Sequence, residues 1–356
     1  MTIHTVYTHS LEQITDIFQL ARLQASELPT SVSSIISLAL GTAGCHVTPQ
    51  LIQKFGLPED ASQAQTVVSV TNKITHQQAW FKARTQKPQL FQQPDILSDP
   101  TVAKQHCDFC NWQNYTASDS FGRTETTHTV TASNLFKYSS QQAHPEAKYP
   151  FLLWNCLPRA GASQFHGHAQ VMLSKVALPC HTQAAITESE MTAAGLGAVT
   201  YQASVLEAYM SLGLVTAVGP SHDRAYCYPS ITPLKDMETV IHGTSLLSSA
   251  FAAAVHGVLR TLVDQLGVTT FNVGISGMAA IGNDLAADFQ RGNTTTCTAP
   301  VIARIVSRGK LSSQASDFGG LEVFASASIG HTDPFVVSAA LQKAMLKVDN
   351  AAANTA

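Results

Sequence analysis

Charged side chains are scarce in this sequence of 356 residues, at 13% of the chain against roughly a quarter in an average soluble protein. The 21 lysines and arginines are balanced by 24 aspartates and glutamates, which gives a formal net charge of −3. Basic residues interleaved with aromatic ones do not cluster anywhere along the sequence. We therefore expect no nucleic acid partner.

Long apolar runs are also missing. The longest uncharged apolar stretch, at about 243–259, includes threonine, serine and histidine and is short for a membrane span. Residues 1–18 lack a basic region followed by an apolar one, so they do not resemble a secretory signal. Because 45% of the residues are hydrophobic, the composition is that of a globular protein. We expect a soluble, cytoplasmic protein without a membrane partner.

Cysteine occurs seven times at irregular spacing, which is not the pattern of a disulfide framework and favours a reducing compartment. Two of the seven form the tight pair Cys107-Asp-Phe-Cys110. Two thiolates at this spacing are typical of half of a metal site. The alternative is two unmetallated thiols in a reducing cytosol.

Hydrophobic periodicity predicts where the helices lie. The length of the chain suggests two packed units or one large α/β body. Helical spacing at 10–28 and at about 59–84 precedes the cysteine pair, so we expect residues 1–104 to form a helical N-terminal extension. Alanine-rich and leucine-rich helical periods return at 186–212 and 244–266.

Other segments favour strands, because they are rich in β-branched and aromatic residues and are bounded by Gly, Ser and Pro. The order of segments predicts an α+β fold with two halves, each a sheet backed by a long helix. The strand candidates are 128–138, 149–159, 270–277 and 301–309. The predicted boundaries after the extension are a first half at 105–215, a second half at 216–345 and a frayed tail at 346–356.

The stretch GASQFHGHAQ, at 161–170, contains the main candidate for chemistry. If 165–172 is a strand, then His166, His168 and Gln170 share one face, because successive side chains alternate. The preceding Gly-Ala-Ser loop lets backbone N–H groups approach an anion without a side chain in the way. A neutral histidine is a competent nucleophile near pH 7, so this combination suggests attack on phosphorus. The alternative is a pair of partly buried histidines on an ordinary strand.

The longer string NCLPRAGASQFHGHAQ, at 155–170, resembles the active-site signature of the galactose-1-phosphate uridylyltransferase branch of the histidine-triad superfamily. The resemblance implies two antiparallel-sheet halves of histidine-triad type with backing helices. It implies that His168 carries a nucleotidyl group as a covalent intermediate, and that Gln170 holds a phosphoryl oxygen or orients that intermediate. Ser163 and the loop amides would stabilise charge on the phosphoryl oxygens. Substrate-binding roles follow for Asn155 and Gly161.

The same resemblance implies a structural zinc. In the family, the first histidine of the motif often joins a Cys-x-x-Cys pair and one intervening histidine. Two thiolates and two imidazoles would form a closed tetrahedral site, which holds structure and does not activate water. The matching residues are Cys107, Cys110, His166 and, as the fourth ligand, His144, with His128 and His106 as alternatives.

A looser resemblance covers 271–277 and 300–335. It places Glu322 where the family has a glutamate that reaches the acceptor sugar phosphate, and its carboxylate can accept hydrogen bonds from sugar hydroxyls. Arg304 and Arg308 can bind phosphate through a guanidinium fork, although ordinary structural arginines are an equal alternative. Asn134 is implied to border the nucleotide. We expect Lys235, a single lysine in a loop, to be solvated.

Galactose specificity is not supported, because the family's tyrosine and glutamine near that glutamate are Leu321 and Ser328 in this sequence.

These features predict an enzyme, a nucleotidyltransferase of carbohydrate metabolism with a covalent nucleotidyl-histidine intermediate. The donor would be a nucleotide sugar or a dinucleotide, and the acceptor a sugar phosphate or inorganic phosphate. A phosphohydrolase of the same superfamily and a non-catalytic zinc-binding relative are the alternatives. A homodimer is an open alternative for the oligomeric state.

Overall fold

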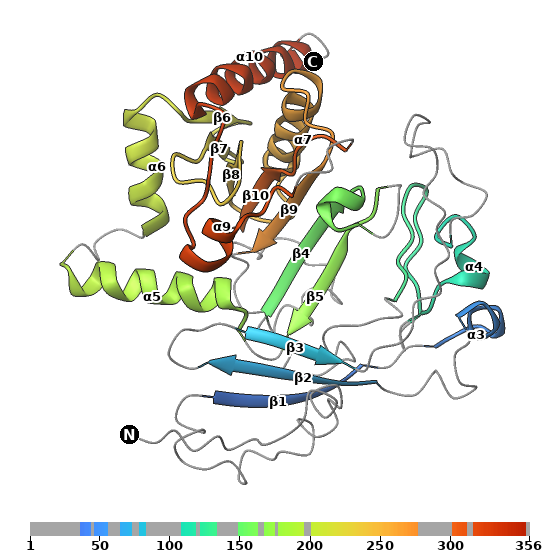
Figure 1. Cartoon of the computed structure of the whole chain (residues 1–356). Helices are drawn as coiled ribbons and strands as arrows, with labels where there is room; N and C mark the ends of the chain where they lie inside the picture. The colour runs from blue at the N-terminus through green and yellow to red at the C-terminus, as the bar shows by residue number, and fades with distance from the viewer. Residues whose placement is uncertain are drawn as a thin grey trace, which may run out of the picture. The chain divides into compact units, whose positions relative to one another are not determined.

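The computed structural model describes residues 36–43, 46–55, 65–72, 78–82, 108–118, 122–133, 149–162, 167–174, 177–195, 201–276, 301–311 and 316–353. The chain divides into two compact units (Figure 1). The first unit comprises 1–94 with 104–147, and the second comprises 95–103 with 148–356.

The first unit contains an antiparallel sheet in the order β1-β2-β3. A short helix, α3 (Pro49–Phe55), contacts the one-turn helix α4 (Trp112–Tyr115), and Leu51 of α3 is buried with Ala117. The strands are β1 (Ile36–Ala43), β2 (Gln65–Asn72) and β3 (Gln78–Lys82).

The helix predicted at about 59–84 is wrong, because this range contains β2 and β3. Most of the β2 sequence, QTVVSVTN, is threonine or valine, whose branched Cβ atoms favour the extended backbone. The described part of the predicted helical extension is therefore mainly sheet. The helix predicted at 10–28 lies outside the described residues.

The second unit is built on one seven-stranded sheet, in which every pair of neighbouring strands is antiparallel. An α+β fold is confirmed. The two predicted halves, however, do not form separate sheets, because β4 pairs with β9 and joins the motif strands to the rest. The sheet order is β5-β4-β9-β10-β8-β7-β6. The strands are β4 (Tyr149–Cys156), β5 (Gln170–Ser174), β6 (Thr216–Val218), β7 (Ala225–Pro229), β8 (Thr239–Gly243), β9 (Phe271–Ser276) and β10 (Val301–Ser307).

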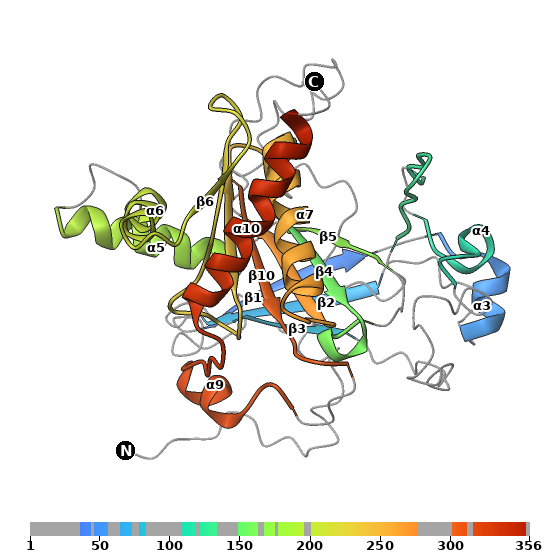
Figure 2. The same cartoon turned by 90° about the horizontal axis from the view of Figure 1, so that it is seen from above.

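Two helices, α7 (Ser249–Asp264) and α10 (Pro334–Ala353), lie side by side on one face of this sheet (Figure 2). Burial alternates along β9 and β10, as expected for strands that turn every second side chain toward the helices. Gly257 allows α10 to come close, since a Cβ there would lie 2.4 Å from Met345 Cε. The predicted helix at 244–266 is confirmed as α7. The tail predicted to fray from residue 346 is instead helical up to Ala353.

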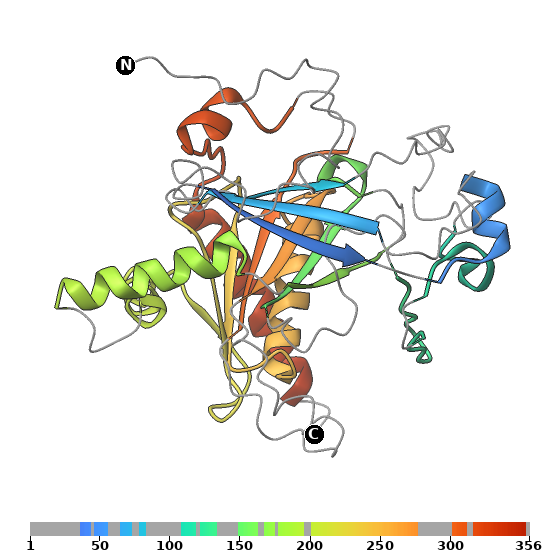
Figure 3. The same cartoon turned by 90° about the horizontal axis from the view of Figure 1, so that it is seen from below.

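The opposite face is covered over β7 and β8 by α6 (Tyr201–Ser211), through a cluster of Tyr209, Leu214, Tyr228 and Val240. The single helical segment predicted at 186–212 contains α6 and most of α5 (Pro179–Ala193), two helices that contact each other (Figure 3). Over β4, β9 and β10 this face carries the polar side chains of the candidate site. None of the helices in the described part of the chain is long and apolar enough to cross a membrane.

Candidate functional site

The register of β4 and β5 places the motif residues. Leu153 is the partner of Gln170 at the end of the ladder, so two further steps would bring His168 opposite Asn155. Trp154 packs against the core under the helices, which puts its neighbour Asn155 on the opposite face. A Cβ on Gly167 would lie 3.9 Å from the Trp154 ring, so position 167 is directed toward the core side. Gln170 therefore lies on the same face as Asn155, and His168 would join them if the alternation of β5 continued back to position 168.

The turn before the motif is a short 3₁₀ helix, η3 (Pro158–Ala160), flanked by two residues with positive φ. Leu157 has φ 69°, an uncommon and costly angle for a non-glycine residue. Gly161 has φ 89°, which glycine adopts without strain, and a Cβ there would lie 3.8 Å from Asn155 Nδ2. The turn thus brings backbone close to Asn155, just ahead of the histidine motif.

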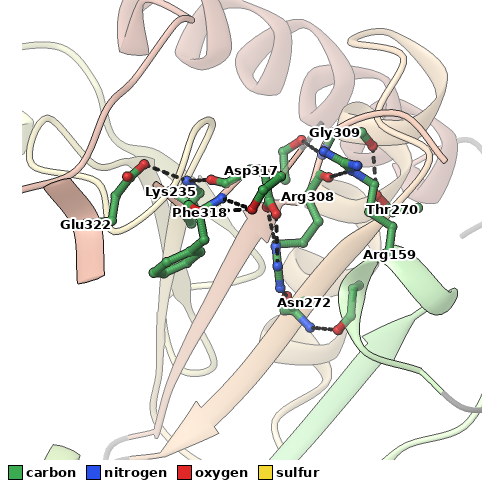
Figure 4. A network of polar contacts seen from close by, with 12 residues as sticks. Arg159, Lys235, Thr270, Asn272, Arg308, Gly309, Asp317, Phe318 and Glu322 are labelled. Carbon is green, nitrogen blue, oxygen red and sulfur yellow. Dashed lines mark hydrogen bonds and ion pairs between the residues drawn. The ribbon is translucent and has the colours of Figure 1, made fainter. Parts of the chain in front are cut away.

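Asn272 on β9 connects this turn to the second half of the sequence. It is the cross-strand partner of Asn155 and donates from Nδ2 to Asn155 Oδ1 at 2.7 Å and to the Ala160 carbonyl at 2.8 Å. Its Oδ1 accepts from Nη1 of Arg308 at 2.7 Å. Figure 4 shows this chain of contacts. One side chain therefore joins the turn, β4 and Arg308.

Arg308 follows β10, and its guanidinium fork is engaged by Asp317. Nε donates to Oδ2 at 2.5 Å and Nη2 to Oδ1 at 3.1 Å. These hydrogen bonds and the positive charge of Arg308 lower the pKa of the Asp317 carboxyl. The backbone of Arg308 is held as well, because its carbonyl accepts from Arg159 Nε at 2.5 Å. The fork expected to bind phosphate thus binds a carboxylate of the chain itself.

Lys235 is only 7% exposed, contrary to the expectation of a solvated lysine. Its Nζ donates to Glu322 Oε1 at 3.0 Å and to the Asp317 carbonyl, and it lies 4.8 Å from the centre of the Phe318 ring. A buried ammonium group needs such partners, because desolvation without them is costly. The bond from Lys235 and the Gly319 N–H lower the pKa of Glu322.

Glu322, the predicted ligand of the acceptor, lies in α9 (Gly320–Ala325). Its Oε2 accepts from the Gly319 N–H at 2.9 Å and its Oε1 from Lys235, so both oxygens hold the local structure. Ser328, in the place of the family's glutamine, donates to the Leu234 carbonyl at 2.9 Å.

Arg304 on β10 has a different partner. Its Nε donates at 2.6 Å to Glu238, a fully buried carboxylate that also accepts from the Leu234 N–H at 2.7 Å. Arg304 therefore compensates a buried charge, as the structural alternative for the arginines anticipated. Its binding of phosphate stays a prediction.

Of the four predicted zinc ligands, the structure describes only Cys110. Cys110 is exposed beside α4 in the first unit. The other three predicted ligands, Cys107, His144 and His166, lie outside the described residues, as do Ser163 and Asn134. Within the described ranges no three His, Cys, Asp or Glu side chains are grouped to hold a metal ion.

Three residues of the polar network were missed or misjudged in the sequence. The signal for Asn272 in the sequence is weak. It is a polar residue on a strand whose buried positions are Phe271, Val273 and Ile275. Asp317 carried no signal, because its partner is set by the fold. Lys235 was treated as an isolated loop residue.

No protein-family model matches the sequence, and no curated protein matches it. Solved structures do resemble the fold. An ADP-glucose phosphorylase from Arabidopsis thaliana with bound ADP-glucose has a TM-score of 0.39 and 14% identity, over 56% of this chain and 60% of that one. A uridylyltransferase mutant has a TM-score of 0.38 and 17% identity, over 57% and 65%. A GALT-like protein from Arabidopsis thaliana has a TM-score of 0.39 and 15% identity, over 56% and 62%.

The matched part is less than two thirds of each of these structures. They belong to the branch whose signature residues 155–170 resemble.

Proposed function

We propose that this protein is a nucleotidyltransferase in which His168 forms a covalent nucleotidyl intermediate. The observation that carries the proposal is the register of β4 and β5: Gln170 pairs with Leu153, and the same register extended by two residues would set His168 opposite Asn155, on the face where the Asn272–Arg308 network lies. A histidine nucleophile, amide groups and a glycine turn occur together there. This combination suits an anionic phosphoryl group, which needs donors and close backbone approach.

The reaction would take two steps. In the first, a ring nitrogen of His168 attacks the α-phosphorus of the donor, an N–P bond forms, and the bond to the leaving sugar phosphate or nucleotide breaks. In the second, an oxygen of the acceptor phosphate attacks the same phosphorus and the N–P bond breaks. Asn155, Gln170 and the turn at Gly161 would hold the phosphoryl oxygens, with Ser163 beside them. Such a cycle gives ping-pong kinetics.

Intact-protein mass spectrometry tests the intermediate. The protein is incubated separately with UDP-, ADP- and GDP-sugars and with a diadenosine polyphosphate, always without acceptor. We expect one acid-labile nucleotidyl adduct, which also identifies the base. It should be absent from His168→Ala and present in His256→Ala, a matched control because His256 is exposed on α7. An adduct that survives in His168→Ala contradicts the mechanism.

The structural zinc stays part of the proposal. Two thiolates and two imidazoles, from Cys107, Cys110, His144 and His166, match the donor set that tetrahedral zinc prefers. Their role would be to hold the fold around the motif. Zinc analysis of Cys107→Ser should show loss of the metal and a lower melting temperature, whereas Cys180→Ser, at an exposed cysteine of α5, should change neither. Equal zinc content in both variants removes the assignment.

Two alternatives have their own signatures. A phosphohydrolase would release nucleotide rapidly without any acceptor, and a non-catalytic zinc protein would melt at the same temperature with every nucleotide tried. A homodimer and a cytoplasmic location stay predictions from the sequence.

A further inference from the structure

The segment 316–325, which includes α9, is attached to the sheet by charge. Its large apolar side chains are mostly solvent-exposed, at 45% for Phe318, 50% for Leu321, 57% for Val323 and 89% for Phe324. Its only charged residues are Asp317 and Glu322. Apolar burial, the usual reason for a segment to stay docked, is therefore small here.

Both carboxylates of the segment engage cations from elsewhere. Asp317 binds Arg308 through both oxygens, and Glu322 binds Lys235 at 3.0 Å (Figure 4). The Phe318 ring lies against both cations, 4.8 Å from Lys235 Nζ and 5.9 Å from Arg308 Cζ. Lys235 Nζ also donates to the Asp317 carbonyl, and among the described residues the remaining hydrogen bonds of this segment run within it or to Ala327. Two ion pairs are thus the main attachment.

Arg308, in contrast, is fixed to the sheet. The Arg308 N–H donates to the Thr270 carbonyl at 2.8 Å, its carbonyl accepts from Arg159, and its Nη1 is held by Asn272. Lys235 is almost fully buried. A guanidinium group that stays in place while its anion sits on a weakly packed segment, with a buried ammonium group against the same Phe318 ring, forms a preorganised anion site.

We propose that Arg308 and Lys235 form a binding site for a phosphate group, and that Asp317 occupies this site in the absence of ligand. A phosphate would replace the carboxylate in the guanidinium fork and release the segment 316–325, because a doubly charged oxyanion pairs more strongly with the two cations. The ligand is inorganic phosphate or a phosphate monoester. The inference rests on the proposed function only in naming this group as the acceptor, since binding itself requires no transfer.

Calorimetric titration with inorganic phosphate at constant ionic strength tests the site. Asp317→Asn removes the carboxylate that competes for the Arg308 guanidinium. This variant should bind phosphate at least ten-fold more tightly than the wild type. Asp264→Asn removes the carboxylate of an exposed ion pair with Arg260 and should bind as the wild type does. Adding Arg308→Gln to Asp317→Asn should abolish binding. Equal affinity in the wild type, Asp317→Asn and Asp264→Asn, or tight binding that survives the loss of Arg308, overturns the proposal.

Hydrogen exchange in the wild-type protein gives a test that does not depend on a variant folding. Saturating phosphate should speed the exchange of peptides covering 316–325 by ten-fold or more relative to chloride at the same ionic strength. Unchanged or slower exchange overturns the displacement of Asp317.

Glucose 1-phosphate, titrated in parallel, distinguishes the two sources: tighter binding than inorganic phosphate assigns the site to a sugar phosphate, and weaker binding to phosphate itself. The His168→Ala variant separates this proposal from the proposed function. It should bind phosphate normally even if no donor forms an adduct with the wild type.

Discussion

The neutral and the charged parts of the polar network are held together in different ways. Asn155 and Asn272 are direct partners in the ladder of β4 and β9, so strand pairing fixes the distance between them. Asp317 and Glu322 instead belong to a segment whose apolar side chains are exposed, and they meet Arg308 and Lys235 through charge. The neutral part is therefore a rigid product of sheet register. The charged part depends on ionic partners that an anionic ligand can replace.

The largest expected loss of stability comes from the ion pair between Arg304 and the buried Glu238. Among the described residues, Arg304→Leu leaves the buried Glu238 carboxylate with only the Leu234 N–H as a partner, and it should lower the free energy of unfolding by about 3 kcal/mol. Arg304 is 45% exposed, so solvent moderates the loss. Urea denaturation of the variant and the wild type measures it. A loss below about 1 kcal/mol would mean that burial does not set the strength of this pair.

A smaller loss is expected in the neutral part. Asn272→Leu keeps the volume of the side chain but deprives Asn155, the Ala160 carbonyl and Arg308 of their hydrogen bonds. We expect about 2–3 kcal/mol less stability in the same denaturation experiment. Stability equal to the wild type would show that these groups find other partners.

The cluster at β7 and β8 predicts a pH effect. Burial lowers the pKa of His242 to about 4 from the usual 6.5. Below pH 6.5 the unfolded chain therefore binds a proton that the folded protein rejects, and stability falls with falling pH. From pH 7 to pH 5 this histidine should cost about 2 kcal/mol. His242→Gln, which can keep a bond to the Tyr228 hydroxyl, should remove that part of the slope; an unchanged slope between the two proteins contradicts the assignment.

The smallest effect is expected at an exposed pair. Arg260 and Asp264 lie one turn apart on α7, with 2.7 Å between Arg260 Nη2 and Asp264 Oδ2. Their side chains are 63% and 41% exposed. Arg260→Leu should change the free energy of unfolding by no more than about 0.5 kcal/mol. Measured beside Arg304→Leu, it isolates the contribution of burial to an arginine–carboxylate pair. Equal losses in the two variants would remove that distinction.

The sequence predicted the second unit better than the first. The strands β4, β9 and β10 were predicted because they are rich in β-branched and aromatic residues, and the helix α7 because its apolar residues recur at a helical period. In the first unit, apolar residues at 59–84 also fitted a helical spacing. There the preference of the β-branched residues of β2 for an extended backbone decided the outcome.

The sequence by itself predicted that His168 and Gln170 share a face, because side chains alternate along an extended chain; of the strand predicted at 165–172, β5 contains residues 170–172. Only the tertiary structure decided what lies on that face and which cations are engaged. Asn272 meets Asn155 across 117 positions, and Lys235 meets Glu322 across 87. Such partners depend on strand order and packing. Local residue preferences cannot specify these partners, because water or another side chain could satisfy each of these polar groups equally well.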